Sequence, residues 1–312
     1  MMIIHDLEQL ASPLINPVLT IGNFDGVHKG HLALFDTVKA KARKIDGQSV
    51  VMTFDPHPLK IMKPGSGPPL ITPLEQKLAL IGRAGIDVVL CIPFTREFAA
   101  IPAADFVRDI LVGRIGIREI VVGHDYTFGQ GRRGDISLLH ELGARMGFKV
   151  HVLKQVHVNG TAVSSTSIRN LVREGDLEGA KNLLGRDYQI CGTVVRGKNR
   201  GGRLLGFPTA NLDLVDELTP KTGVYAVTVL VDERTFKGVT NIGYNPTFHN
   251  AQFSVETHVL DLSEDLLGKT IRINFIERLR DERHFNTIED LSRQIGRDIR
   301  RARELFEKKG PA

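Results

Sequence analysis

The chain has 312 residues, 42% of them hydrophobic and 25% charged, with a formal net charge of +5. These proportions exclude a disordered, collagen-like or disulfide-framework protein, and the length suits about two domains. No apolar stretch approaches the ~18 residues that span a bilayer, and the first residues do not resemble a signal peptide. The basic excess is small and evenly spread. It does not indicate a nucleic-acid surface, since phosphate-bearing small molecules would explain the same bias.

The two cysteines, Cys91 and Cys191, lie far apart, and each is part of an apolar run. A structural disulfide or a metal site would need cysteines or histidines that cluster along the chain. We therefore expect a protein of a reducing compartment, the cytoplasm.

The first part of the chain alternates short apolar runs with amphipathic segments. A strand candidate at 17–22 leads into a helical pattern from His31 to about Ile45. The other strand candidates are 49–54, 87–94, 119–123 and 148–153, and the other helical segments are about 73–84, 103–113, 135–146, 166–174 and 176–184. Val/Ile runs separated by helices predict a parallel sheet covered on both faces. We expect residues 1–186 to form a doubly wound α/β domain, whose ligands bind beyond the carboxyl ends of the strands.

From Tyr188 onward the pattern changes to strands joined by turn residues, with no helical pattern between them. The strand candidates are 188–195, 223–231, 235–243, 253–260 and 270–276. This arrangement predicts an antiparallel, barrel-like β domain over residues 187–312. A long amphipathic helix, at about 286–308, closes the chain.

The segment GNFDGVHKGH (22–31) is the sharpest local motif, because it follows a strand and opens a helix. Backbone N–H groups and the helix dipole attract phosphate at such a place. His28 and His31 are three residues apart, so both imidazoles can face one phosphate and stabilise its charge. A glycine-rich turn with a capping histidine is the simpler interpretation, but the second histidine favours the functional one. The further candidates for contacts with a phosphate-bearing ligand in this segment are Gly22, Phe24 and Gly30.

A second anion-binding motif, VSSTSIR (163–169), lies at the end of this domain. Ser164, Ser165 and Thr166 offer hydroxyl and N–H groups at a helix start, and Arg169 adds a positive charge. Alone, such a run is more often an N-cap. Together with HKGH, it indicates a second cradle for phosphate groups.

HKGH resembles the HxGH signature of the nucleotidylyltransferase superfamily, and VSSTSIR resembles the second signature of that superfamily. TFDPHP (53–58) and VVGHDYTFGQGRRGD (121–135) resemble segments of the adenylyltransferase module of prokaryotic bifunctional riboflavin kinase/FAD synthetases. The resemblance implies a Rossmann-like domain in which these segments help to form the pocket for flavin and adenosine. Phe54 and Phe128 are then stacking candidates for the isoalloxazine ring, and Asp125 is a polar contact. A plain core position is the alternative for a phenylalanine at a strand end.

The second domain resembles the riboflavin kinase of the same family, most closely in GFPTAN (206–211). By itself, PTAN would be interpreted as a turn at an edge strand. The resemblance implies that Thr209 and Asn211 supply oxygen ligands, which suit a Mg²⁺ bound with ATP. The ATP contacts that it implies in this domain are Gly197, Gly202, Pro208 and Thr209.

Two further segments of the second domain match the family. In FSVETHVLD (253–261), Glu256 corresponds to the family's general base, which takes the proton of the attacking ribityl hydroxyl. Without the GFPTAN match, a strand glutamate would be expected to face solvent. Arg280, in RLRDERHF (278–285), is either a flavin contact or an ordinary charged helix entry.

The resemblance covers nearly the whole chain and implies two successive ATP-dependent steps. The C-terminal domain phosphorylates riboflavin to FMN, and the N-terminal domain adenylylates FMN to FAD and releases pyrophosphate. Mg²⁺ with ATP is the implied cofactor. The implied partners are small molecules (ATP, riboflavin and FMN), with no nucleic acid and no membrane, and the oligomeric state stays open.

Three other interpretations are distinguishable. A different HxGH enzyme, such as a pantetheine-phosphate or nicotinamide-mononucleotide adenylyltransferase, has no use for the GFPTAN domain. A nucleic-acid-binding barrel would have a clustered basic face and binding that falls steeply with salt. A flavin-binding regulator without catalysis would have eroded motifs, whereas both HKGH histidines, Thr209, Asn211 and Glu256 are present.

Overall fold

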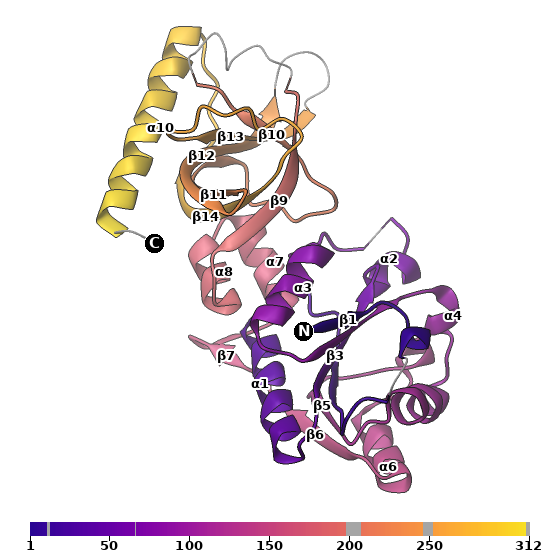
Figure 1. Ribbon diagram of the computed structural model, residues 1–312. Coiled ribbons are helices and arrows are strands. Elements are labelled where there is room, and N and C mark those ends of the chain that lie inside the picture. The colour runs from indigo at the N-terminus through magenta and orange to yellow at the C-terminus, as the bar shows by residue number, and fades with distance from the viewer. Residues whose placement is uncertain (11–12, 66, 198–206, 246–251, 310–312) are drawn as a thin grey trace. The chain divides into compact units, whose positions relative to one another are not determined.

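The computed structural model describes residues 1–10, 13–65, 67–197, 207–245 and 252–309 (Figure 1). The chain divides into two compact units, residues 1–165 and 166–312. The first unit contains a parallel sheet between helices, and the second contains two short helices, a closed β-barrel and a long terminal helix. The architecture predicted from the sequence, a doubly wound α/β part followed by an antiparallel barrel, is confirmed.

The sheet of the first unit has six strands in the spatial order β1-β4-β3-β2-β5-β6, and all neighbouring strands are parallel. Its strands are β1 (Met2–Ile4), β2 (Val18–Ile21), β3 (Ser49–Asp55), β4 (Val88–Pro93), β5 (Glu119–Gly123) and β6 (Lys149–Leu153). The direction of winding reverses between β2 and β5, so the loop after β2 lies at the switch point where ligands bind in such sheets.

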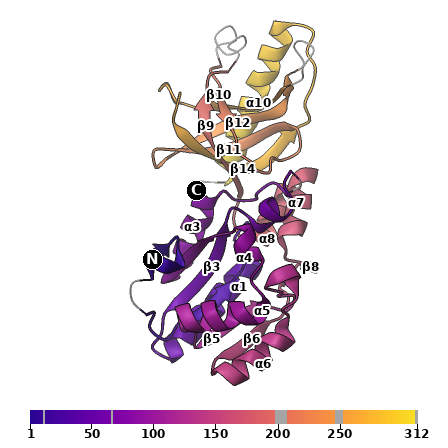
Figure 2. The ribbon, with the colours of Figure 1, turned by 90° about the vertical axis from the view of Figure 1, so that its right-hand side faces the viewer.

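Helices cover both faces of this sheet, as Figure 2 shows. Val51 of β3 packs with residues of α1 and α3, whereas its neighbours Val50 and Met52 pack with η2 and α6. Because successive strand residues point to opposite faces, these two clusters are the two cores of an α/β sandwich. The helices are η1 (Leu7–Gln9), α1 (Lys29–Lys44), α2 (Pro58–Met62), α3 (Leu74–Arg83), α4 (Arg96–Ala99), α5 (Ala103–Asp105), the π-helical η2 (Phe106–Ile115), η3 (Gln130–Arg132) and α6 (Ile136–Met146).

The barrel of the second unit closes in the order β10-β13-β12-β11-β14-β9, with all pairs antiparallel. Its strands are β9 (Tyr188–Val195), β10 (Ala210–Asp213), β11 (Gly223–Val231), β12 (Arg234–Asn245), β13 (Gln252–Val259) and β14 (Thr270–Arg280). Helix α8 (Leu177–Leu184) packs on β9 and β14, and α10 (Ile288–Lys309) packs on β12 and β14. Phe306 and Ala302 of α10 are buried against Val239 and Leu279, which explains the apolar stripe of this helix.

Several elements differ from those expected. The strands β1 and β10 and the small hairpin of β7 (His157–Val158) and β8 (Thr161–Ala162) have no counterpart among the predicted strands. Helix α7 (Ser165–Glu174) begins at the last residue of the first compact unit, and the rest of α7 and the whole of α8 fall within the second. In the described ranges, no helix has both the length and the apolar composition needed to cross a bilayer.

Candidate active sites

The segment 22–31, which connects β2 to α1 and ends in the HKGH motif, begins where β2 ends, at the switch point of the sheet; we call it the HKGH loop. His28 is the N-cap of α1, and its Nδ1 accepts a hydrogen bond from the backbone N–H of His31 at 3.3 Å. The two imidazole rings stack with their centroids 3.5 Å apart, and the Phe24 ring meets His31 edge-on at 5.1 Å. Since Nδ1 of His28 accepts a bond, the ring proton is carried on Nε2. The loop therefore places an imidazole donor at a helix start, an arrangement suited to stabilising a phosphate oxygen.

Small residues and an unusual backbone make this close packing possible. A Cβ on Gly30 would lie 3.2 Å from the His28 ring, and one on Gly22 would lie 3.0 Å from the Phe24 ring. Phe24 and Val27 have left-handed backbone conformations, with φ of 49° and 38°. Each such conformation costs roughly 1–3 kcal/mol in a residue with a side chain, so surrounding contacts must hold the loop.

Asp25 makes the first of these contacts. Its carboxylate is 3% exposed and accepts hydrogen bonds from the backbone N–H groups of Ile71 and Thr72, both at 3.0 Å. The Thr72 hydroxyl in turn accepts the N–H of Gly26 at 3.0 Å. A buried carboxylate is stable only when it is bonded in this way. The HKGH loop is thereby anchored to the segment that leads into α3.

Lys77 of α3 makes the second contact. Its Nζ donates to the carbonyl oxygens of Asn23, at 3.3 Å, and Phe54, at 3.1 Å, and to the Thr53 hydroxyl, at 3.1 Å. Burial lowers the pKa of Lys77 below its ordinary value, although electrostatic interactions with Cys91, Asp25 and Asp55 oppose this shift. The ammonium group thus joins the HKGH loop to the carboxyl end of β3.

The VSSTSIR segment meets the same loop through Ser165. The hydroxyl of Ser165, the first residue of α7, donates to the carbonyl oxygen of Asp25 at 2.9 Å. Ser164 beside it is half-buried. Thr166 is exposed and Arg169 is buried, and both belong to the second compact unit. The two predicted phosphate motifs are therefore in contact within the first unit, through the Ser165 hydroxyl.

The aromatic candidates for the flavin are core residues. Phe54 is 8% exposed and packs edge-on against Phe94, and Phe128 is 6% exposed and stacks on Tyr126 with centroids 5.6 Å apart. Both rings belong to the core cluster on the η2 face of the sheet. Asp125 is exposed in the loop after β5. Both phenylalanines therefore occupy core positions, which is the alternative that the sequence allows for a phenylalanine at a strand end.

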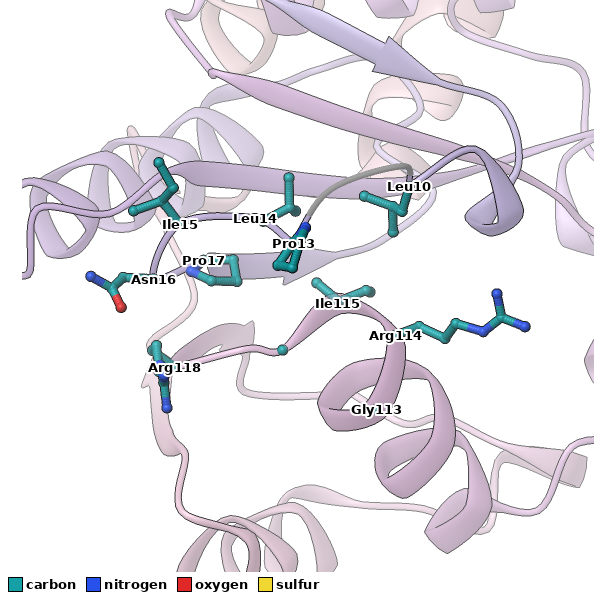
Figure 3. Close-up of a pocket in the computed structure, with 11 residues that line it drawn as sticks. Leu10, Pro13, Leu14, Ile15, Asn16, Pro17, Gly113, Arg114, Ile115 and Arg118 are labelled. Carbon is teal, nitrogen blue, oxygen red and sulfur yellow. The ribbon is translucent and has the colours of Figure 1, made fainter.

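Two cavities lie at opposite ends of the sheet. The larger, about 410 Å³, lies at the amino ends of β2 and β5, where Figure 3 shows Leu14, Pro17, Ile115 and Arg118 around it. It contains none of the predicted site residues. The smaller, about 20 Å³, lies at the carboxyl ends, beside the HKGH loop; its lining includes Asn23, Asp25, Phe54, Asp55, His57 and Lys77. Among the described residues, no cluster of three or more His, Cys, Asp or Glu could hold a metal ion.

In the second unit, Asn211 and Glu256 lie opposite each other on neighbouring strands. Asn211 of β10 pairs with Glu256 of β13, and Glu256 pairs with Asn241 of β12. Directly paired residues point to the same face of a sheet. Because Ala210 and Leu212 are buried on either side of Asn211, the three polar side chains form a row on the outer face of the barrel. We call Asn211, Glu256 and Asn241 the polar row.

Gly197 lies against one end of the polar row. A Cβ at Gly197 would lie 2.2 Å from Nδ2 and 3.1 Å from Oδ1 of Asn211, so no larger residue fits there without a shift. Pro208 and Thr209 are exposed just before β10, and Nδ1 of His258 donates to the carbonyl oxygen of Pro208 at 2.7 Å. Gly202 lies outside the described residues, as does the rest of 198–206.

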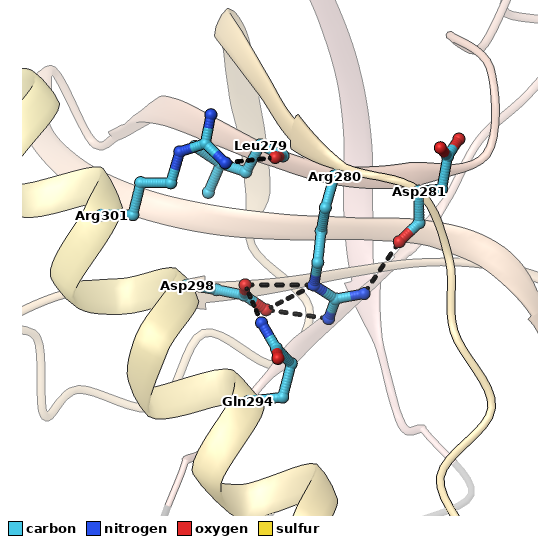
Figure 4. A network of polar contacts seen from close by, with 6 residues as sticks. All are labelled: Leu279, Arg280, Asp281, Gln294, Asp298 and Arg301. Carbon is cyan, nitrogen blue, oxygen red and sulfur yellow. Dashed lines mark hydrogen bonds and ion pairs between the residues drawn. The ribbon is translucent and has the colours of Figure 1, made fainter.

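Arg280 is held in a structural ion pair. Its Nε and Nη2 donate to the carboxylate of Asp298 on α10, at 2.8–3.1 Å, and its Nη1 donates to the Asp281 carbonyl oxygen at 2.9 Å (Figure 4). Gln294 adds a bond to the same carboxylate at 2.8 Å. The pair is largely buried, with side-chain exposures of 13% and 7%. These contacts fasten α10 to the end of β14, and a flavin contact by Arg280 stays a prediction.

Asp25 and Lys77 are the site residues that sequence reasoning misses. Asp25 lies inside the recognised motif, but its partners are 46 and 47 residues away. Lys77 left a local signal, since Leu74, Lys77, Leu78 and Ile81 follow the i, i+3, i+4, i+7 spacing of a buried helix face. A lysine on an apolar stripe needs acceptors that can satisfy it in the interior.

The chain matches two family models: FAD synthetase over residues 12–167, and riboflavin kinase over residues 184–306. The chain is 40% identical over 310 residues to the bifunctional riboflavin kinase/FMN adenylyltransferase of Escherichia coli K12, covering 99% of this chain and 98% of that one. The chain belongs to this bifunctional family. The enzyme of Pseudomonas fluorescens is 37% identical over 306 residues, covering 98% of each chain. A crystal structure described as that of a macrolide-efflux protein from Streptococcus pneumoniae shares the fold, with a TM-score of 0.85, 29% identity and coverage of 97% and 98%.

Family membership settles the two activities. The FAD synthetase part is N-terminal and the riboflavin kinase part is C-terminal, so the chain phosphorylates riboflavin to FMN and adenylylates FMN to FAD. ATP and flavins are its substrates. The resemblance that the sequence motifs carry is confirmed over the full length of the chain.

Proposed function

We propose that the HKGH loop is the adenylylation site. The phosphate of FMN attacks the α-phosphorus of ATP there, and pyrophosphate leaves. His28, which carries its ring proton on Nε2, and His31 stabilise the charge that builds on the phosphoryl oxygens. The observation that carries this proposal is the stacked histidine pair at the start of α1, beyond the carboxyl end of β2. The backbone around Gly22, Phe24 and Gly30 lets the nucleotide approach closely.

The VSSTSIR segment holds the leaving pyrophosphate in this proposal. Ser164, Ser165 and Thr166 offer hydroxyl and N–H groups at the start of α7, and Arg169 adds its charge. The bond from Ser165 to Asp25 supports the assignment, because it joins this helix start to the loop that carries the histidines. Phe54, Phe128 and Asp125 line the pocket of the flavin in this proposal. The rings of Phe54 and Phe128 are buried in the core and form the floor of that pocket.

The polar row is the proposed site of riboflavin phosphorylation. Glu256 accepts the proton of the terminal ribityl hydroxyl as that oxygen attacks the γ-phosphate of ATP. Thr209 and Asn211 hold Mg²⁺, which neutralises phosphate charge when it is bound. The hydroxyl of Thr209 and the amide oxygen of Asn211 are hard oxygen donors of the kind that Mg²⁺ prefers, and Gly197 packs closely against the Asn211 amide. Gly197, Gly202 and Pro208 contact ATP, and Arg280 contacts the flavin.

We also propose the cytoplasm as the compartment and residues 1–186 and 187–312 as the limits of the two catalytic modules. Cys91 and Cys191 are both present as thiols, which agrees with reducing surroundings. The start of the riboflavin kinase match at residue 184 supports the module boundary. Small molecules are the proposed partners.

Two variants test the assignment of sites to modules. The protein is incubated with riboflavin and Mg-ATP, or with FMN and Mg-ATP, and the flavins are separated by chromatography. We expect His28→Ala to lower FAD formation by roughly 10²- to 10³-fold while FMN formation continues. Glu256→Gln should lower riboflavin phosphorylation by roughly 10²- to 10⁴-fold while supplied FMN is still converted to FAD. If either variant lost both activities equally while folded, the assignment would be wrong.

A further inference from the structure

We propose that Lys77 is a positioning residue for adenylylation, which holds the HKGH loop in its reactive conformation by joining it to the end of β3. The inference rests on the proposed role of His28 and His31. Lys77 acts through the backbone of the loop and needs no contact with substrate.

The three acceptors of Lys77 account for all the protons of its ammonium group. They are the carbonyl oxygens of Asn23 and Phe54 and the hydroxyl of Thr53, at 3.1–3.3 Å. The Thr53 hydroxyl also donates to the Asn23 carbonyl, at 3.1 Å. An ammonium group has three donors and no acceptor, so this site satisfies it completely. Asn23 therefore has two donors fixing its carbonyl group, immediately before the left-handed residue Phe24.

Packing of α3 does not by itself explain why a lysine occupies position 77. Lys77 is only 8% exposed, and it borders the cavity of about 20 Å³ beside the HKGH loop. Burial of a charged group is costly, and packing alone would be served by an apolar residue on this stripe of α3. What the lysine adds is a directional bond to a loop whose conformation is strained at Phe24 and Val27. Catalysis by orientation depends on such fixing, since a displacement of about 1 Å can cost 10²-fold in rate.

Lys39 provides a matched control. Its Nζ also donates to a backbone carbonyl, that of Ala84 at 2.6 Å, and this bond joins α1 to the end of α3. This bond lies at the far end of α3 from Lys77 and touches neither the HKGH loop nor β3. Replacing either lysine by methionine keeps a similar length and removes the donor.

The experiment compares Lys77→Met and Lys39→Met in two measurements. Hydrogen exchange of the substrate-free protein, followed by mass spectrometry, should be faster by roughly tenfold in segment 22–31 in Lys77→Met but not in Lys39→Met. In the adenylylation assay, Lys77→Met should lower kcat by roughly 10- to 100-fold, with the KM for FMN changed less than about threefold. Riboflavin phosphorylation by the same chain should stay within about twofold of the wild type. Lys77→Arg, which keeps a charged donor, should recover part of the lost kcat.

Thr53→Val gives a second route if Lys77→Met does not fold, because it preserves shape and removes both the Thr53 bond to the Asn23 carbonyl and one acceptor of Lys77. It should give the same changes at smaller size. The proposal would be overturned if Lys77→Met left both the exchange of segment 22–31 and the kcat of adenylylation unchanged; Thr53→Val takes its place if Lys77→Met does not fold. It would also be overturned if Lys77→Met and Lys39→Met lost adenylylation activity equally. Failure of the adenylylation site itself would be visible separately, as FAD formation that survives His28→Ala.

Discussion

The two proposed sites differ in how their residues are held. In the first unit, His28 and Asp25 are 5% and 3% exposed, and the loop that carries them has left-handed residues fixed by bonds from distant segments. In the second unit, the polar row lies on the outer face of the barrel, and its side chains inherit their positions from regular antiparallel pairing. Positioning and stability are therefore coupled at the buried site, whereas at the barrel site the backbone pairing sets the positions and a change in one outward side chain should cost only the roughly 0.2–1 kcal/mol of a cross-strand pair.

The largest effect on stability and activity is expected from a substitution that removes the bonds holding the HKGH loop. Asp25→Asn keeps the shape of the side chain but turns one acceptor into a donor that faces the N–H groups of Ile71 and Thr72. Loss of bonds to a buried charged group should lower the free energy of unfolding of the first unit by roughly 2–3 kcal/mol. FAD formation should fall by roughly 10²-fold because the loop is released. Thermal unfolding and the adenylylation assay measure the two effects.

Asp36→Asn is the control for this prediction. Asp36 lies on α1 in the same unit, but its side chain is 73% exposed and pairs only with Lys39 among the ion pairs described. Its replacement should leave FAD formation unchanged and stability within about 0.5 kcal/mol. A stable Asp25→Asn protein with full adenylylation would show that the loop is not held by this carboxylate, and the contrast between the two sites would disappear.

A smaller effect, confined to activity, is expected at the barrel site. Gly197→Ala introduces a Cβ that would lie 2.2 Å from Nδ2 of Asn211, so the amide must move. Riboflavin phosphorylation should fall by roughly 10- to 100-fold, while the melting temperature and FAD formation from FMN stay close to the wild type. Steady-state kinetics of both half-reactions and calorimetry on the same sample test this separation.

Gly296→Ala is the matched control, because a Cβ at Gly296 of α10 meets only the end of the Arg300 side chain, at 3.9 Å. It should leave the kinase unchanged, and the better helix propensity of alanine should raise stability slightly. A loss of stability in Gly197→Ala as large as that in Asp25→Asn would mean that the barrel site, too, is coupled to folding.

The same contrast explains what the sequence could predict. The strands 119–123, 188–195 and 223–231 have the predicted limits, because long apolar or alternating patterns report burial directly. The histidine pair could be singled out because residue type and short spacing carry its chemistry, whereas Asn211 and Glu256 lie far apart in the sequence and could be singled out only through the resemblance of their segments to the riboflavin kinase family. The limits and pairing of β10 could not be predicted, since Ala210–Asp213 has only four residues and acquires its partners from segments far along the chain.

The anchoring of the HKGH loop was beyond the reach of local patterns for the same reason. Lys77 bonds to residues 54, 24 and 23 positions earlier, and Asp25 to residues 46 and 47 positions later. No periodicity reports such pairs. Phe54 illustrates the opposite case, in which one residue allowed two interpretations and burial against Phe94 selects the core position. Its part in flavin binding depends on what the substrate contacts and stays a prediction.

The smallest effect is expected where a buried group of the barrel unit lies apart from the polar row. The carboxyl group of Glu217 accepts the backbone N–H of Cys191 in β9, at 3.0 and 3.2 Å from its two oxygens. Burial raises the pKa of Glu217 from 4.5 to about 7, although the bond from Cys191 opposes the shift. Between these two values the folded chain holds a proton that the unfolded chain has released. Stability is therefore lost as the pH rises through this window.

Glu217→Gln should remove this pH dependence, because glutamine keeps an acceptor for Cys191 and has no charge to bury. We expect the variant to match the wild type near pH 5 and to exceed it at pH 8 by on the order of 1 kcal/mol, after allowing for solvent screening. Calorimetry at pH 5, 6.5 and 8 measures the difference, with Glu304→Gln, an exposed position of α10, as the control that should not show it. Both activities should be unchanged, since Glu217 is not part of the polar row. If Glu217→Gln were less stable than the wild type at pH 8, the ionised carboxylate would be stabilising there. The burial of Glu217 would then not carry the free-energy cost that its raised pKa implies.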